Sequence, residues 1–154
     1  AARGSVLWYL HADTGVPSGA LAALRASTAP WGCFAVALDS HDPRLRCTAF
    51  VMNARARLTG SATGDMAIWA RRTLVDAIGG WPALAAFEDL AFTDRARAHA
   101  RFEVLGPPVT TSARRWEARG VTRTMVEMLA LRGAYRAGVD PARLARLYEA
   151  GARG

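Results

Sequence analysis

The feature that most constrains the fold is an alternation between short apolar runs and longer segments with the apolar spacing of helices. The apolar runs cover residues 5–10, 33–38, 66–70, 102–105 and 109–112. The segments with helical spacing cover residues 18–27, 43–60, 72–78, 88–100 and 121–137, and a last one begins at Asp140. Strands that alternate with helices are typical of a layered α/β domain, so we predict this fold class.

Residues that favour helix ends support several of these boundaries. Ser18 is a candidate cap for the first helix, and Pro43 suits the first turn of the second. Gly60 and the glycine pair at 79–80 suit helix ends. The apolar residues that we expect on buried helix faces are Leu21 and Leu24 in the first helix and Leu45, Ala49, Met52 and Ala56 in the second.

Composition limits the class of protein. Hydrophobic residues make up 51% of the 154 residues, which suits a single domain with a sizeable core. The longest stretch without a charged residue or histidine, residues 26–38, is shorter than the roughly 20 apolar residues of a membrane-spanning helix. The first residues have no signal-peptide pattern. Cys33 and Cys47 lack the spacing of a zinc site or redox motif, so we expect reduced thiols and a cytoplasmic location.

The charge balance favours an anionic partner. The formal net charge is +7, and all 20 basic side chains are arginine. Nucleic acid, phosphate or an acidic membrane surface would suit such a chain. The arginines are scattered, however, and solvated arginine-rich surfaces explain them equally well.

Two polar clusters follow or precede predicted strands. His11 and Asp13 follow the first strand, and ligands of open α/β sheets bind at the carboxyl ends of strands, where a carboxylate suits a divalent cation. Gly64 and Asp65 precede the strand at 66–70, where glycine permits a close approach and the carboxylate accepts hydroxyl groups. Each cluster is also an ordinary turn sequence.

Two further clusters carry charge. Glu88 and Asp89 begin a helix, and neighbouring carboxylates raise each other's pKa, which suits a general base. Arg114, Arg115 and Trp116 suit a diphosphate, because guanidinium groups match phosphate oxygens and an aromatic ring can form a wall. Ordinary helix-terminal charge and a basic surface turn are the alternatives.

The order of the four clusters resembles that of a known family. The segments LHADTGVPSGALAAL, TGDMAIWARRTLVDAIGGWP, FEDLAFTDRAR and PVTTSARRWEARGVTRTM, closed by YRAGVDPARLARLY, resemble family 2 glycosyltransferases, nearest to the bacterial branch described as radical-SAM/selenodomain-associated transferase 2. The resemblance runs from about Val6 to Tyr148. It implies a GT-A-like (Rossmann-like) mixed sheet flanked by helices. Residues 1–120 would be the C-terminal part of the catalytic domain, and residues 121–154 a C-terminal helical extension packed on it.

The resemblance also gives each cluster a role. Asp13 and His11, at the DxD position, would bind Mg²⁺ or Mn²⁺, and Gly64 and Asp65 would bind the acceptor. Asp89, with Glu88 in the ED motif, would remove the proton of the acceptor hydroxyl. Arg114, Arg115 and Trp116 would bind the donor diphosphate. The implied reaction is an inverting transfer of sugar from a nucleoside-diphosphate sugar to an acceptor hydroxyl, with the acceptor unknown. Ser112 stands where processive relatives have glutamine, which argues against a processive synthase.

The opening strand of the family, of the type VSVIIPxxNE, has no counterpart here. The resemblance therefore implies that the nucleotide-binding front of the domain is missing and that residues 6–10 have an uncovered strand edge. Such an edge favours association with another chain, such as a second copy. We expect this chain alone to bind metal–diphosphate weakly, to discriminate poorly between bases and not to turn over a sugar donor.

Two other classes of function are compatible with parts of the sequence. A nucleotidyltransferase of similar fold also uses metal-binding carboxylates, but the ED motif ahead of RRW argues against it. An arginine-rich nucleic-acid-binding module would lack catalysis, and no zinc finger, RNP-like pattern or GxxG loop supports it, so we expect no nucleic-acid partner. The helix at 121–137 combines apolar residues with arginines, so it suits peripheral contact with the inner face of the membrane, burial on the domain or a dimer interface.

Overall fold

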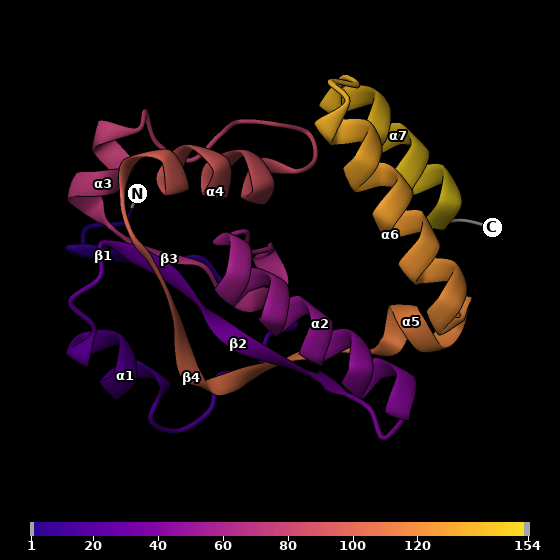
Figure 1. The fold of residues 1–154 in the computed structure, drawn as a ribbon, viewed down its shortest axis with the longest axis horizontal. Helices are drawn as coiled ribbons and strands as arrows, with labels where there is room; N and C mark the ends of the chain where they lie inside the picture. Colours follow the sequence, from indigo (N-terminus) through magenta and orange to yellow (C-terminus); the bar gives the residue numbers. More distant parts are fainter. Residues whose placement is uncertain (1, 153–154) are drawn as a thin grey trace.

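The computed structural model describes residues 2–152, with side chains as far as Tyr148. It contains one mixed sheet, whose strands in spatial order are β1 (Val6–Trp8), β3 (Trp69–Arg71), β2 (Trp31–Asp39) and β4 (Phe102–Ser112). β3 is antiparallel to both of its neighbours, and β2 and β4 are parallel. The predicted α/β class is confirmed, with the sheet packed against helices (Figure 1).

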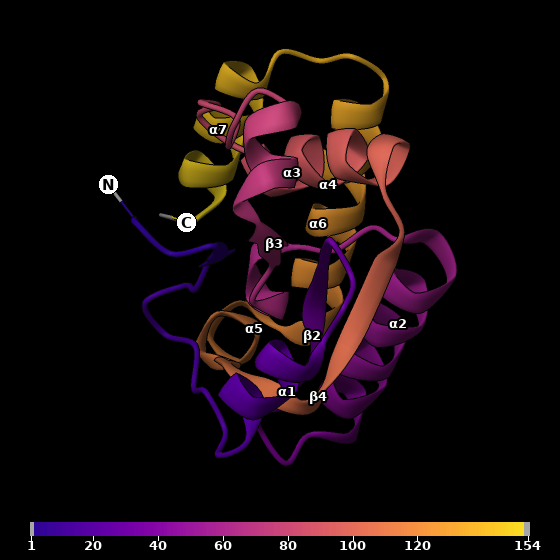
Figure 2. The same cartoon turned by 90° about the vertical axis from the view of Figure 1, so that its left-hand side faces the viewer.

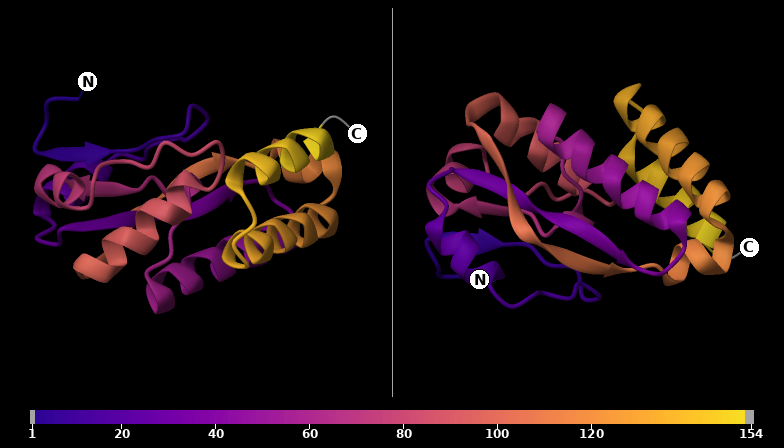
Figure 3. Two further views of the ribbon diagram at one scale, coloured as in Figure 1. Left: turned by 90° about the horizontal axis from the view of Figure 1, so that it is seen from above. Right: turned by 60° about the horizontal axis from the view of Figure 1, so that its bottom comes forward.

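Seven helices accompany the sheet in the described part of the chain. They are α1 (Ala20–Ala26), α2 (Pro43–Thr59), α3 (Arg72–Ala77), α4 (Glu88–His99), α5 (Arg114–Arg119), α6 (Val121–Arg136) and α7 (Pro141–Ala152). Figure 2 shows α1 and α2 on opposite sides of β4. α6 and α7 lie side by side as a helical hairpin next to α2 (Figure 3).

The boundaries of α2 agree with the sequence prediction. The Asp42 side chain caps the helix by accepting the backbone N–H of Arg44 at 2.8 Å, and Pro43 occupies the first turn. Gly60 ends the helix with a φ of 64°, a left-handed conformation that glycine adopts without steric cost. Three of the four residues expected on its buried face are buried, and Met52 is half-buried.

The prediction for α1 was wrong at its start. Gly19, with a φ of 89°, precedes the helix in place of Ser18, and no side chain caps it. Ala20 and Leu24 face the core, whereas Leu21, which was expected on the buried face with Leu24, is 50% exposed.

The predicted strand at 66–70 was also misplaced. A turn of 3₁₀ helix, η1 (Gly64–Met66), occupies its start, and β3 begins only at Trp69. Ala67 ends η1 with a φ of 48°, so the backbone cannot continue from η1 as a strand. The N–H of Gly64 is bound to Asp89 on another element, which no local pattern reveals.

The predicted strands at 102–105 and 109–112 form the single strand β4. The ladder with β2 joins Leu105 to Phe34 and resumes with Val109 opposite Val36. Residues 106–108 lie in the irregularity of register between these pairs. The two proline nitrogens, which carry no hydrogen, therefore interrupt no ladder bond.

The first strand lies at an edge of the sheet, as predicted. β1 pairs only with β3 among the described residues, and it is shorter than the predicted run at 5–10. The Tyr9 N–H adds one bond beyond it, to the Ile68 carbonyl at 2.8 Å.

The main core lies around β2 and β3. Its largest fully buried side chains include Trp31, Trp69, Phe34, Phe92, Met66 and Ile68. A second, smaller cluster contains Leu45, Ala113 and Val121, with Trp116 packed against it. This second cluster joins α2, α5 and α6, and it therefore fixes the position of α5, which follows β4.

The apolar residues of α6 are largely exposed rather than packed on the domain. Val121 and Thr124 are its buried residues, whereas Val126 is 60% and Leu129 is 63% exposed. None of the helices in the described range 2–152 is long and apolar enough to cross a membrane.

Candidate functional site

The loop after β1 is fixed to β4 by a pair of backbone hydrogen bonds. The N–H of Gly15 donates to the Thr110 carbonyl at 2.7 Å, and the N–H of Thr110 donates back to Gly15 at 2.9 Å. This pairing holds His11 and Asp13 beside the carboxyl end of β4, two residues before Arg114 opens α5. Residues about 100 positions apart in sequence are thereby brought to one place.

His11 contacts the second predicted cluster. Its Nδ1 lies 3.4 Å from Oδ1 of Asp65, and this hydrogen bond raises the pKa of the His11 imidazole. The Nε2 edge of the ring faces Gly64 so closely that a Cβ at Gly64 would collide with it. Glycine at this position therefore allows the ring of His11 to pack directly on the backbone of η1.

Asp89 contacts the same backbone from the other side. Its Oδ2 accepts the N–H of Gly64 at 2.8 Å, and its Oδ1 accepts the N–H of Leu90 at 2.7 Å. Burial raises the pKa of the Asp89 carboxyl, which these two hydrogen bonds partly oppose and the negative charges of Glu88 and Asp65 reinforce. A buried carboxyl with a raised pKa is suited to accept a proton.

The basic cluster lies on α5. Arg114 and Arg115 are exposed, and Trp116 is half-buried against the smaller core cluster. The guanidinium carbon of Arg115 lies 5.0 Å from the centre of the Tyr148 ring, within the range of a cation–π contact. Tyr148 on α7 thus restricts where Arg115 can point.

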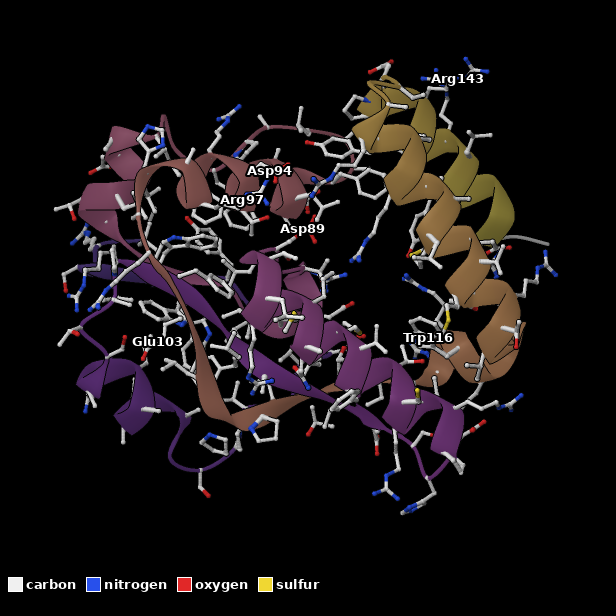
Figure 4. All side chains as sticks on the ribbon, viewed as in Figure 1. Asp89, Asp94, Arg97, Glu103, Trp116 and Arg143 are labelled. Carbon is white, nitrogen blue, oxygen red and sulfur yellow. The ribbon has the colours of Figure 1, made fainter. Side chains whose placement is uncertain are left out.

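α6 connects the two ends of the site. It begins next to α5, which carries Trp116, and it ends beside the first turn of α4, which carries Asp89 (Figure 4). At that end the Tyr135 ring stacks on Phe87 with centroids 5.2 Å apart. Arg136 adds an ion pair to Asp94 at 3.6 Å.

A cavity of about 940 Å³ lies between α2, α5 and α6, and three of the four predicted clusters line it. The predicted residues in its wall are His11, Asp13, Asp65, Arg114, Arg115 and Trp116. Gly64, Glu88 and Asp89 are not in the wall, and Asp89 is joined to it only through the Gly64–Asp65 backbone. The cavity has carboxylates on the η1 side and arginines on the α5 side.

Sequence reasoning missed several wall residues, of which Arg55 is the most notable. Arg55 on α2 donates from Nε to the Ser61 carbonyl at 3.3 Å, and burial lowers the pKa of its guanidinium. Thr48, Met52 and Arg55 recur at helical spacing and all line the cavity. The spacing of these three residues is visible in the sequence, but the sequence does not show that α6 lies on the other side of the cavity. The other missed polar wall residues include Thr111, Arg119, Thr124, Arg132 and Tyr148.

The donor set fits a divalent cation only in part. Among the described residues, no group of three or more His, Cys, Asp and Glu side chains is arranged to hold a metal ion. Asp13 is exposed on the cavity wall, and no described side chain pairs with its carboxylate, so this carboxylate can bind a cation. The His11 ring already faces Asp65 and Gly64 with its two nitrogens. A metal here would therefore take the remaining ligands from a bound anion or water.

The contact between Gly64 and His11 gives a first prediction. Gly64→Ala should lower the free energy of unfolding by about 1–3 kcal/mol, the usual cost of overpacking, because the new methyl group displaces the ring. In a His11→Ala background the same change should cost much less, and a double-mutant cycle in urea measures this coupling.

Gly133→Ala is the control, because nothing lies within 4 Å of a Cβ built there in the last turn of α6. It should be neutral or stabilising. An equal cost of Gly64→Ala with and without His11 would contradict the described packing.

The two cysteines should differ in reactivity. Burial raises the pKa of the Cys33 thiol to about 12, whereas Cys47 is exposed on the cavity wall. Since the thiolate is the reactive form, iodoacetamide at pH 8 should modify Cys47 and leave Cys33 unmodified until urea is added. Peptide mass mapping gives the readout, and equal labelling of both thiols in the folded chain would contradict the assignment.

Comparison of the chain with protein-family models, with curated proteins and with solved structures gives no match.

Proposed function

We propose that this chain carries the site of a glycosyltransferase that moves a sugar from a nucleoside-diphosphate sugar to an acceptor hydroxyl, with inversion and with Mg²⁺ or Mn²⁺. The fold proposed with it is GT-A-like. The resemblance in motif order suggests both, and the arrangement of the site supports them.

One observation carries the proposal. Three clusters separated by about 50 residues each, at 11–13, 64–65 and 114–116, line the same cavity, and the fourth is hydrogen-bonded to the second. Isolated turns and surface charge have no reason to converge in this way. A cavity with arginines on one side and carboxylates on the other suits a ligand that carries both a diphosphate and hydroxyl groups.

In the proposed mechanism the protein residues divide the work. Arg114 and Arg115 bind diphosphate oxygens and stabilise the charge that develops as the bond to the anomeric carbon breaks. Asp65 accepts a hydrogen bond from an acceptor hydroxyl, and His11 fixes the orientation of Asp65. Asp89, which lies behind the wall and accepts the Gly64 N–H, is the proposed base for the attacking hydroxyl, and its raised pKa suits that step.

Asp13 is the residue that would hold the metal. Its carboxylate is exposed in the wall and has no described side-chain partner. Bound there, Mg²⁺ or Mn²⁺ supplies Lewis-acid stabilisation of the leaving diphosphate. We assign His11 the positioning of Asp65 rather than the metal, since both nitrogens of the ring face protein groups.

We propose a cytoplasmic location for the protein. Cys33 and Cys47 are free thiols, which is compatible with a reducing compartment.

A donor screen tests the proposal. Melting temperatures are measured with Mg²⁺, Mn²⁺ or EDTA, each with and without a panel of nucleoside diphosphates and their sugars. The proposal expects stabilisation that requires both metal and diphosphate. Stabilisation by metal with nucleoside triphosphates only would favour a nucleotidyltransferase. Binding to RNA or DNA that falls steeply with salt, with no response to diphosphates, would favour a nucleic-acid-binding module.

A further inference from the structure

The wall between α2 and α6 contains two buried polar atoms that no described residue satisfies. These are Nη2 of Arg55 and Oγ1 of Thr124. Both residues line the cavity, and Thr124 is only 1% exposed. Buried polar groups are normally hydrogen-bonded, and a guanidinium N–H together with a hydroxyl can satisfy one anionic oxygen.

The charges near this wall are mixed, since the carboxylates of Asp65 and Asp89 act on Arg55 and two further arginines line the cavity. Arg132 of α6 and Arg119 of α5 line the same cavity, and Arg119 is already paired with Glu127 at 2.9 Å. Arg55 and Arg132 project from α2 and α6, whereas the proposed diphosphate residues Arg114 and Arg115 project from α5. The cavity thus has arginines from α2 and α6 in addition to the two on α5 that are proposed to bind the donor diphosphate.

The rest of this wall is apolar. The apolar residues that α2 and α6 contribute to it are Val51, Met52, Met125, Met128 and Leu129. The same two helices also carry the exposed apolar side chains of Phe50, 71% exposed, and Val126, 60% exposed. Methionines and branched aliphatic side chains pack readily on flexible hydrocarbon chains. The volume of about 940 Å³ is at the upper end of the range for small-molecule sites.

We infer that the acceptor taken by this site is an amphiphile, with an anionic head group bound by Arg55 and Thr124 and a hydrocarbon chain lying between α2 and α6. This inference rests on the proposed function, because the head group would place a hydroxyl near Asp65, with Asp89 behind the wall on the Gly64 N–H. Charge complementarity selects an anionic head over a neutral one, and the apolar walls select a chain over a free anion.

The test uses alkyl phosphates as probes, below their micelle concentrations. Calorimetry should show that affinity for decyl phosphate exceeds that for butyl phosphate by about tenfold or more, since each buried CH₂ adds to the hydrophobic term. Decyl maltoside and inorganic phosphate should bind more weakly than decyl phosphate. Decyl phosphate should also protect Cys47 from iodoacetamide, because Cys47 lines the same cavity.

Two variants with matched controls locate the binding. Arg55→Gln should weaken decyl phosphate binding about tenfold or more, whereas Arg57→Gln, an exposed arginine on the same helix, should not. Leu129→Gln should reduce the difference between decyl and butyl phosphate, whereas Leu58→Gln, 84% exposed and outside the wall, should not. Leu129 lies outside the two hydrophobic core clusters, and the glutamine amide can still donate a hydrogen bond in place of Arg55; circular dichroism verifies that both variants fold.

Several results would overturn the inference. They are equal affinity for decyl and butyl phosphate, equal affinity for decyl maltoside and decyl phosphate, and no effect of Arg55→Gln. Protection of Cys47 that grows with protein concentration without ligand would show that a second copy covers the groove. Sedimentation with anionic vesicles that Arg55→Gln does not change would show binding to a surface without insertion of a head group.

The outcomes also separate this inference from the proposed function. If decyl phosphate fails to bind but metal and diphosphate bind together, only the inference falls. If decyl phosphate binds as described but diphosphate does not bind with any metal, the amphiphile site stands and the glycosyltransferase proposal falls.

Discussion

Asp89→Asn in the full-length protein should reduce turnover of the sugar donor by about 10²-fold or more while donor affinity is retained. The loss is the usual size of a general-base contribution. Asparagine can still accept the N–H of Gly64 through its amide oxygen, so η1 should keep its position. Release of the nucleoside diphosphate measures turnover, and calorimetry measures donor binding.

The pH dependence of the wild-type protein provides a second readout for Asp89. Because its pKa is raised, the acidic limb of kcat/KM should lie above the ordinary value of an aspartate, with activity lost as the pH falls through it. Asp76→Asn, on the exposed side of α3, makes the same chemical change away from the site and should leave turnover unchanged. Activity of Asp89→Asn within a factor of a few of the wild type would remove Asp89 from the mechanism.

Replacing Arg114 and Arg115 together with alanine should weaken binding of magnesium–pyrophosphate by about 10²-fold, since hydrogen bonds to charged groups contribute about 1.5–3 kcal/mol each. Both side chains are exposed, so the fold should be kept. The contact of Arg115 with Tyr148 predicts a further, smaller effect of Tyr148→Ala, through loss of orientation.

The control for this variant must remove the same amount of charge. Arg25→Ala with Arg46→Ala does so at two exposed positions outside the cavity. With a net charge of +7, the chain attracts anions in general, and the control measures that contribution. Equal weakening by the two double variants would mean that α5 holds no specific diphosphate site.

Local sequence signals predicted the elements whose ends are set locally. Pro43 and Gly60 bracket α2 in the structure as in the prediction, because a helix start and a left-handed end depend on the residue itself. The start of α1 was predicted wrongly, since Ser18 and Gly19 are both plausible before a helix and glycine took the position. Residues 106–108 continue β4 because they fall where the ladder shifts register, which only the partner strand decides.

In the candidate site, too, the local features were predictable and the contacts between distant elements were not. The residue types at 11–13, 64–65, 88–89 and 114–116 were identifiable from their chemistry, but their convergence depends on the pairing of Gly15 with Thr110 and on the bond from Gly64 to Asp89. Arg55 was missed because its significance arises only once α6 packs opposite α2. Contacts between distant elements have no local sequence signal, and for this reason the wall of the cavity could not be predicted.

The central claim is that Asp13 and the α5 arginines bind a metal–diphosphate from two sides of one cavity. Calorimetric titration of pyrophosphate into the wild type and Asp13→Asn, each with Mg²⁺ and with EDTA, tests it most directly. We predict that removing the metal and replacing Asp13 each weaken binding about tenfold or more, and that the two changes together cost little more than either alone, because they remove the same interaction. Binding that is equal with and without Mg²⁺ and unchanged in Asp13→Asn would contradict the account.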